Sequence, residues 1–167
     1  TGACIHTLEG HGYSLNSMCV SADGSRLFSG SWDNTIKMWD VATGSCMHTL
    51  QGHENCVNSV CVSADGTRLF SGSDDHVIKA WDVTTGACVQ TMQGHTHVVN
   101  SVRLSADGLR LFSGSADRTI KVWDVATGAC VQTLEGHTRV VESLCVSGSQ
   151  LFSVGWNRTM KVWSTLP

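Results

Sequence analysis

Short patterns of apolar and polar residues recur along the chain, and together they predict a structure made of strands. In the first pattern apolar residues alternate with small polar ones, as in VNSVCV from Val57. The second is RLFSGS, as from Arg68, and the third ends in Trp-Asp, as in VIKAWD from Val77. Period-two alternation is typical of half-buried strands. Since no stretch has helical character, we predict an all-β protein.

Turn residues separate these strands. SADG begins at Ser21, Ser63 and Ser105, after the first strand of a repeat, and Asp-Gly favours the positive φ angles of a tight hairpin. The last repeat has SGSQ from Ser147 instead, which is two residues shorter. TGxC follows the tryptophan strand and leads into a fourth strand. Each complete repeat is therefore predicted to hold four short strands.

The repeats have a regular period. The tryptophans of the third strand are Trp39, Trp81, Trp123 and Trp163, spaced by 42, 42 and 40 residues. Self-similarity at such a period indicates a repeat architecture. We expect one unit over residues 1–167, with an outer strand at 1–10 and repeats at 11–52, 53–94, 95–136 and 137–167.

Composition and charge narrow the class of protein. With 41% hydrophobic residues, the 167-residue chain can bury a core, and its net charge of −3 comes without basic blocks. Nucleic acid and membrane are therefore not expected as partners. No apolar run approaches the roughly 20 residues that span a bilayer, and residues 1–10 lack the order of a signal peptide. We expect an intracellular, cytoplasmic location.

Periodicity also accounts for most of the cysteines. The eight cysteines are Cys4, Cys46, Cys88 and Cys130 in TGxC, Cys19, Cys61 and Cys145 at one strand position, and Cys56 in neither series. Because no CxxC pair occurs, disulfides and zinc have little support, and we expect small buried side chains in a reducing compartment. Cys56, next to a variable loop, is the candidate for exposure.

The combination of Gly-His near one end of each repeat and Trp-Asp near the other resembles the WD-repeat β-propeller family, in which each repeat forms a four-stranded antiparallel blade. In that family, the tryptophan donates to a serine or threonine, which contacts the histidine, which contacts the aspartate. The resemblance implies the structural sets His11, Ser29, Asp33 and Trp39; His53, Ser71, Asp75 and Trp81; His95, Ser113, Asp117 and Trp123; and His137, Ser153, Asn157 and Trp163.

The recurring histidines do not predict catalysis. Residues one blade apart cannot converge to the metal-ligand distance of about 2 Å, and the repeated Ser-His-Asp sets lack a nucleophile elbow. We therefore expect no enzyme activity, no metal and no cofactor. Asn157 replaces the aspartate of the other sets, and since charge-assisted hydrogen bonds are the stronger ones, the last blade should be the least firmly held.

The repeats differ mainly just after Gly-His and just before the turn aspartate. In the family that the chain resembles, these positions lie on one rim of the central channel. Aromatic and arginine side chains there are of the types that dominate interfaces, although neutral drift of exposed loops is an alternative. The predicted partner-binding rim is Tyr13, Asn16, Trp32, Asn55, Asp74, His97, Arg139, Glu142 and Trp156.

Three functions remain open. The first is a non-enzymatic scaffold that binds a protein or peptide through this rim. The second is a propeller that binds a glycan or small ligand, because Trp32 and Trp156 could stack on apolar ligand faces. The third is a recently amplified or engineered, self-assembling repeat array with no selected partner.

Four repeats are few for a closed propeller, whose WD-type members usually have seven blades. If two chains meet head to tail, residues 1–10 of each chain could complete the last blade of the other. We therefore hypothesise an eight-bladed ring made by a homodimer. A single-chain four-bladed ring and a fragment of a longer chain are the alternatives.

Overall fold

The computed structural model describes residues 2–164 and shows an all-β chain in which each sheet is a blade. Blade 1 holds β1 (Leu15–Val20), β2 (Arg26–Ser31), β3 (Ile36–Asp40) and β4 (Cys46–Leu50); blade 2 holds β5 (Val57–Val62), β6 (Arg68–Ser73), β7 (Ile78–Asp82) and β8 (Cys88–Met92). Blade 3 holds β9 (Val99–Leu104), β10 (Arg110–Ser115), β11 (Ile120–Asp124) and β12 (Cys130–Leu134); blade 4 holds β13 (Val141–Ser147), β14 (Gln150–Gly155) and β15 (Thr159–Ser164). Within each blade, consecutive strands pair antiparallel.

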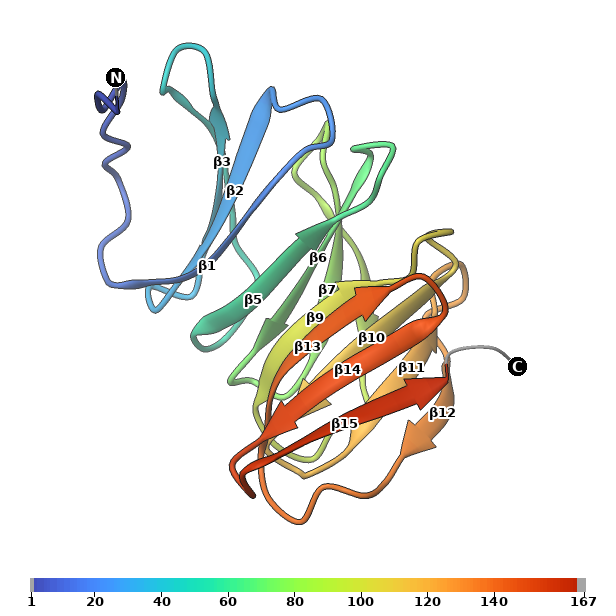
Figure 1. Ribbon diagram of the computed structural model, residues 1–167. Helices are drawn as coiled ribbons and strands as arrows, with labels where there is room; N and C mark the ends of the chain where they lie inside the picture. The colour runs from blue at the N-terminus through green and yellow to red at the C-terminus, as the bar shows by residue number, and fades with distance from the viewer. Residues whose placement is uncertain (1, 165–167) are drawn as a thin grey trace.

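The blades stand side by side in an open arc (Figure 1). The innermost strands pack in chain order, β1 against β5, β5 against β9, and β9 against β13. Blades 1 and 4 lie at the two ends of this arc, so the chain does not close into a four-bladed ring. The four sheets agree with the predicted blades: blades 1 to 3 have four strands, and blade 4 has three among the described residues, in line with the hypothesis that residues 1–10 of another chain complete it.

Each innermost strand contains a β-bulge, which strict period-two alternation does not predict. In blade 2, Val57 pairs with Ser73 and Ser59 pairs with Gly72, so Asn58 has no partner across the ladder. A bulge places two residues opposite one and turns the strand. As a result, Val57 and Val60, three positions apart, both pack toward blade 1. The same shift occurs in β1, β9 and β13.

The core consists of three similar joints between neighbouring blades. At the first joint, Phe28 and Met38 of blade 1 pack against Val57 and Val60 of blade 2. The blades approach so closely at Gly30 that a Cβ atom there would lie 2.7 Å from Cγ1 of Val57. Equivalent distances are 2.6 Å at Gly72 with Val99 and 2.7 Å at Gly114 with Val141. The glycine of RLFSGS is therefore required by packing between blades.

The SADG turns differ from the predicted Asp-Gly hairpin. Only the glycine has a positive φ, 72° at Gly24, whereas Asp23 uses its carboxylate to accept the N–H of Ser25. The hydroxyl of Ser21 donates to the same carboxylate at 2.5 Å, and the Gly24 N–H donates to the Ser21 carbonyl. The aspartate thus stabilises the turn through side-chain hydrogen bonds.

Residues 2–10 form no strand within a single copy, where no strand lies beside them to pair with, and Thr1 lies outside the described residues. Their place as an outer strand that completes a blade of a second copy stays a prediction.

One expectation needs correction, because the cysteines are less buried than expected. All eight are unpaired, and Cys4, Cys46, Cys88, Cys130 and Cys145 are exposed. Cys46, Cys88 and Cys130 begin the outer edge strands β4, β8 and β12, and Cys145 lies on β13, the innermost strand of the blade at one end of the arc (Figure 1).

Candidate partner-binding site

A chain of hydrogen bonds ties the rim loops of each blade to its tryptophan strand. In blade 2, Trp81 Nε1 donates to the hydroxyl of Ser71 at 2.8 Å, and that hydroxyl lies 2.7 Å from His53 Nε2. His53 Nδ1 lies 2.7 Å from Oδ2 of Asp75. Blades 1 and 3 repeat these contacts with distances of 2.7–2.8 Å. The structure thus joins the members of each expected set.

The direction of these hydrogen bonds follows from their chemistry. The indole of Trp81 can only donate, so the Ser71 hydroxyl accepts from it and has its own hydrogen free for His53 Nε2. The other nitrogen, Nδ1, then carries the proton and donates to Asp75. Burial by itself would raise the pKa of Asp75, but hydrogen bonds from His53 and from the backbone N–H of Glu54 and Val77 outweigh it and hold the pKa at about 2.

Blade 4 departs from this arrangement where the sequence does. His137 Nδ1 lies 3.3 Å from Oδ1 of Asn157, a longer contact to a neutral acceptor. The remaining contacts are retained, with Ser153 at 2.7 Å from His137 and 2.9 Å from Trp163. The amide therefore replaces the charge-assisted hydrogen bond of the other blades with a weaker one.

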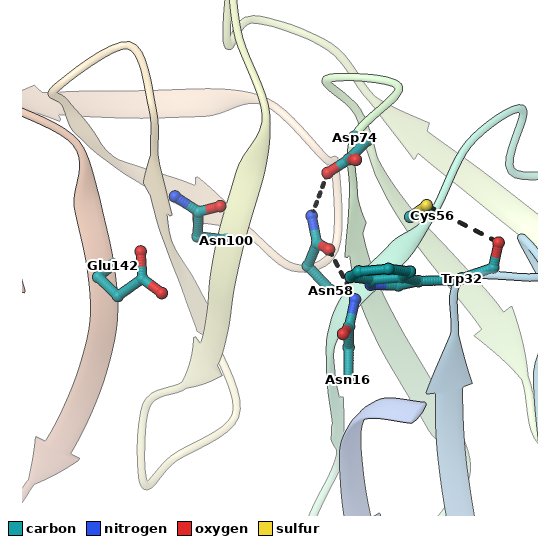
Figure 2. A pocket seen from close by; sticks show the side chains of 7 residues that line it. All are labelled: Asn16, Trp32, Cys56, Asn58, Asp74, Asn100 and Glu142. Carbon is teal, nitrogen blue, oxygen red and sulfur yellow. Dashed lines mark hydrogen bonds between the residues drawn. The ribbon is translucent and has the colours of Figure 1, made fainter. Parts of the chain in front are cut away.

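A cavity of about 530 Å³ opens among the innermost strands on the same rim (Figure 2). It is lined by Asn16, Trp32, Cys56, Asn58, Asp74, Asn100 and Glu142. Figure 2 shows the Trp32 indole extending toward Asn16 and Asn58, with Asn100 and Glu142 across the opening. Trp32 is 54% exposed. The cavity thus combines one accessible aromatic face with amide and carboxylate groups.

The bulges explain how these amides reach the cavity. Asn16, Asn58, Asn100 and Glu142 are the unpaired residues of the four bulges. Asn16 Nδ2 donates to Oδ1 of Asn58 at 3.0 Å, and Asn58 Nδ2 donates to Oδ1 of Asp74 at 2.5 Å. A bulge re-aims one side chain at each strand start, and the hydrogen bonds then align Asn16, Asn58 and Asp74 along one side of the cavity.

The cavity contains four of the predicted rim residues, namely Asn16, Trp32, Asp74 and Glu142. The other five lie outside its lining and are exposed: Tyr13, Asn55, His97, Arg139 and Trp156. The carbonyl of Asn55 accepts from the Ser73 hydroxyl at 3.0 Å, so the backbone of Asn55 helps to fix the rim loop to strand β6. The structure therefore separates Trp32 from Trp156, which the sequence comparison treated alike.

Cys56, Asn58 and Asn100 also line the cavity, although they were not among the predicted rim residues. Asn58 and Asn100 recur in register with Asn16, and recurrence alone resembles a scaffold position. The sequence feature that could have identified them is a polar amide inside a strand that otherwise holds apolar and small residues. Cys56 is partly buried, and its thiol donates to the Trp32 carbonyl at 3.7 Å. Burial and the nearby Asp74 carboxylate raise the pKa of Cys56, which disfavours the thiolate.

Among residues 2–164, no group of three or more His, Cys, Asp or Glu side chains is placed to hold a metal ion. The part of the chain that the structure describes also contains no helix long and apolar enough to cross a membrane.

The repeated four-stranded blade and its Trp-Ser-His-Asp hydrogen bonds define a propeller-type repeat protein. The family model "WD domain, G-beta repeat" (WD40) matches residues 2–40, 44–82, 86–124 and 128–164. Because these matches cover nearly the whole chain, the protein belongs to the WD40 repeat family.

Individual relatives match over shorter lengths. A 41-residue stretch, 25% of the chain and 3% of the relative, is 61% identical to the vegetative incompatibility protein HET-E-1 of Podospora anserina. A 40-residue stretch, 24% of the chain and 12% of the relative, is 40% identical to the small ribosomal subunit protein RACK1 of Dictyostelium discoideum. The crystal structure of the RRP9 WD40 repeats superposes with a TM-score of 0.91 at 32% identity, covering 96% of this chain and 50% of that one. The chain thus spans half of that solved chain and a small part of these relatives.

Proposed function

We propose that this protein is a non-enzymatic scaffold that binds a protein or peptide in the rim cavity. The observation that carries the proposal is the half-exposed Trp32 indole beside a 530 Å³ cavity lined by amides and carboxylates. Tryptophan is enriched among residues that dominate binding energy. Membership of the WD40 family, whose propellers are typically non-enzymatic scaffolds, supports the same function.

The lining indicates the chemistry of the ligand. Asp74 and Glu142 supply carboxylates, and the asparagines supply amides, while none of the seven lining residues is basic. Such a site favours N–H donors and a positive charge. A lysine or arginine side chain of a peptide would fit beside the Trp32 ring, where a cation–π contact contributes about 0.5–2 kcal/mol. The same acidity disfavours nucleic acid, whose phosphates would meet Asp74 and Glu142.

Peptide titration followed by tryptophan fluorescence or calorimetry tests this proposal. An array of peptides would be screened, and the best basic peptide compared with the same peptide carrying norleucine for lysine. Trp32→Ala should weaken binding at least about tenfold, the scale of a hot-spot residue. Trp156→Ala is the matched control, because Trp156 is 67% exposed but lies outside the cavity, and it should leave the affinity unchanged.

The outcomes separate the candidate functions. Equal affinities for wild type and Trp32→Ala would show that the peptide binds without Trp32 and would remove the rim proposal, whereas no binding by any peptide or oligosaccharide would favour a repeat array with no selected partner. Equal affinities for the lysine and norleucine peptides would retain the site but remove the basic side chain from its specificity.

A glycan is the second candidate ligand, because an aromatic face beside Asn16, Asn58 and Asp74 also suits a sugar ring with its hydroxyls. Quenching of Trp32 fluorescence by oligosaccharides but not by peptides would favour it. The Trp156→Ala background isolates this signal from the other exposed tryptophan on the rim.

We further propose that two copies assemble head to tail into an eight-bladed homodimer. The placement of residues 6–10 supports this assembly. A Cβ on Gly44 would lie 3.2 Å from Leu8 and 3.3 Å from His6, just as Gly86 meets Leu50 and His48 of β4. His6 Nε2 also lies 3.1 Å from the Ala42 carbonyl. Residues 6–8 thus lie against blade 1 as β4 lies against blade 2, in the position of a preceding blade's outer strand.

We propose that the blade preceding blade 1 in the ring is blade 4 of a second copy, and that residues 4–8 become its outer strand. Its last described strand, β15, has no strand on its outer side and could pair with residues 4–8 of the partner as β3 pairs with β4. Light scattering of the purified chain tests the assembly. The proposal expects twice the chain mass of 17.9 kDa, and a concentration-independent species at 17.9 kDa would contradict it.

We also propose that the protein works in a reducing, intracellular compartment, the cytoplasm. Eight unpaired cysteines, five of them exposed, support this location, because exposed thiols oxidise readily elsewhere. Immunofluorescence in the source cells, with fractionation as an independent measurement, tests it. Recovery of the protein in a secreted fraction would contradict the proposal.

A further inference from the structure

Three contacts recur at each joint between blades, and they define what a blade needs in order to receive the next one. The first is the close approach at glycine, where Gly30 faces Val57. The second is an amide hydrogen bond to the next blade, from Asn16 to the Val57 carbonyl at 3.4 Å. The third is a serine hydroxyl, Ser17 Oγ, that accepts the N–H of Val60 at 3.1 Å.

The other two joints repeat these contacts. The amides of Asn58 and Asn100 donate to the carbonyls of Val99 and Val141 at 3.3 and 3.0 Å. The corresponding serines, Ser59 and Ser101, accept the N–H groups of Val102 and Leu144 at 3.1 Å. The glycine contacts are likewise shared, at Gly72 and Gly114. The joints are therefore equivalent, and their chemistry can be compared with that of the open faces.

The open face of blade 4, which is the face turned away from blade 3, carries a suitable residue for only one of the three contacts. Ser143 stands where Ser17 does, but the glycine position is held by Val154 and the asparagine position by Glu142. A Cβ alone would already come within 3 Å of an incoming side chain at this point, and Val154 adds two methyl groups. An ionised glutamate can only accept, so Glu142 would meet the incoming backbone carbonyl without a hydrogen.

The open face of blade 1 is also altered at the matching positions. Leu15 and Met18 stand where blade 2 has Val57 and Val60, and they are 59% and 74% exposed. Leucine and methionine are longer than valine. If two copies packed as neighbouring blades pack within one chain, Leu15 of one copy would point at Val154 of the other. Both side chains would then add volume at the point where the joints within a chain require a glycine.

We propose that Val154 and Glu142 make the joint between two copies weaker than the joints within one chain, so that copies pair reversibly through it. This inference rests on the proposed head-to-tail assembly, and it identifies the residues that set its strength. The second copy is the occupant because residues 6–10 already lie beside blade 1 as an outer strand would, and Ser143 keeps its place to accept the N–H of Met18. The excess volume between Val154 and Leu15 sets blade 1 of the partner further from blade 4 than blades stand within a chain.

Sedimentation equilibrium of the full chain and four variants tests the proposal. Val154→Gly and Glu142→Asn restore the internal contacts singly, and the double variant restores both. Val154→Ala is the matched control, because it removes the methyl groups but keeps the excluded Cβ. The dimer dissociation constant should fall at least about tenfold in the double variant and less in Val154→Ala. Tryptophan fluorescence and circular dichroism confirm that each variant is folded.

The result for wild type distinguishes the two proposals. A monomeric wild type with a dimeric double variant would show that Val154 and Glu142 weaken the joint, but it would remove the proposed homodimer and, with it, the reversible pairing of wild-type copies. A dimeric wild type whose dissociation constant is the same in all variants would retain the homodimer and overturn the inference. Monomers throughout, up to the highest soluble concentration, would overturn both.

Discussion

His53 Nδ1 lies 2.7 Å from a carboxylate oxygen of Asp75, whereas the equivalent nitrogen in blade 4 is 3.3 Å from a neutral amide oxygen. Asp75 also accepts the backbone N–H groups of Glu54 and Val77, at 3.0 and 3.2 Å. The carboxylate therefore satisfies three donors at once, and these contacts join the rim loop to the strands beneath it.

Asp75→Ala should destabilise the protein more than Asn157→Ala. Loss of Asp75 leaves the buried His53 Nδ1 and two backbone N–H groups without their acceptor, which costs about 2–4 kcal/mol. Asn157 makes one long contact to His137 and accepts the Thr159 hydroxyl, so its loss should cost about 1 kcal/mol. Urea denaturation followed by tryptophan fluorescence measures both, and equal shifts of the midpoint would contradict the expectation.

Acid should remove the stabilisation that Asp75 provides. Its pKa is about 2 in the folded state and 3.8 ordinarily, so the folded protein holds the carboxylate in its charged form more strongly. For a depressed pKa, the stabilisation is present above about pH 4 and is lost as the pH falls toward 2. The difference in stability between wild type and Asp75→Asn should therefore shrink over this range. Urea midpoints at pH 7, 4 and 2.5 test it, and a pH-independent difference would argue against the aspartate as the source.

Gly72→Val should weaken the joint between blades 2 and 3. A Cβ at position 72 would lie 2.6 Å from Cγ1 of Val99, so the larger side chain must displace the neighbouring blade, at a cost of about 1–3 kcal/mol. Gly72→Val with Val99→Ala is the control, because it removes the group that the new valine meets. The thermal midpoint should fall in the single variant and recover in part in the double one, and a double variant less stable than the single would refute the steric explanation.

Arg118→Gly should stabilise the protein. Arg118 has a φ of 74°, in the left-handed region that costs a non-glycine residue energy, and it stands in the exposed turn before β11. Glycine removes this strain, and a gain of about 0.5–1 kcal/mol is expected. Asn34, at the same turn position with a φ of 69°, is the comparison: asparagine tolerates this region, and its amide donates to the Glu54 carbonyl at 3.4 Å, so Asn34→Gly should bring no gain. Chemical denaturation measures both, and a less stable Arg118→Gly would contradict the strain argument.

Much of the architecture could be predicted from the sequence because it depends on local, repeated patterns. Each repeat has nearly the same spacing from its tryptophan to its histidine, serine and aspartate or asparagine. The structural set assigned in one repeat could therefore be assigned in the others, around Trp39, Trp81, Trp123 and Trp163. Strands β2, β6 and β10 begin and end with the repeated RLFSGS. The departure at Asn157 was also visible in the sequence, and its consequence appears as the longer contact to His137.

The rim was predicted less completely, because repeat-to-repeat variation identifies residues that differ but not the direction in which they point. The bulges turn Asn58 and Asn100 into the cavity, and a register shift of this kind depends on pairing with the next strand. Trp32 and Trp156 look equivalent in the aligned repeats. Only the arc places Trp32 beside blade 2, where Asn58 and Asp74 complete the cavity, while Trp156 belongs to the blade at the open end.

By itself, the sequence determined the strands and the period of the blade, and its resemblance to a known family implied the hydrogen-bonded set that each tryptophan joins. All of these arise from contacts within about 40 residues. The tertiary structure alone decided how blades meet. It showed that the glycine of RLFSGS is needed because Val57, Val99 and Val141 reach the backbone of the preceding blade. With that contact known, Val154 and Glu142 become meaningful as residues at a joint, because packing across blades is a property of neighbours in space and not of the repeat.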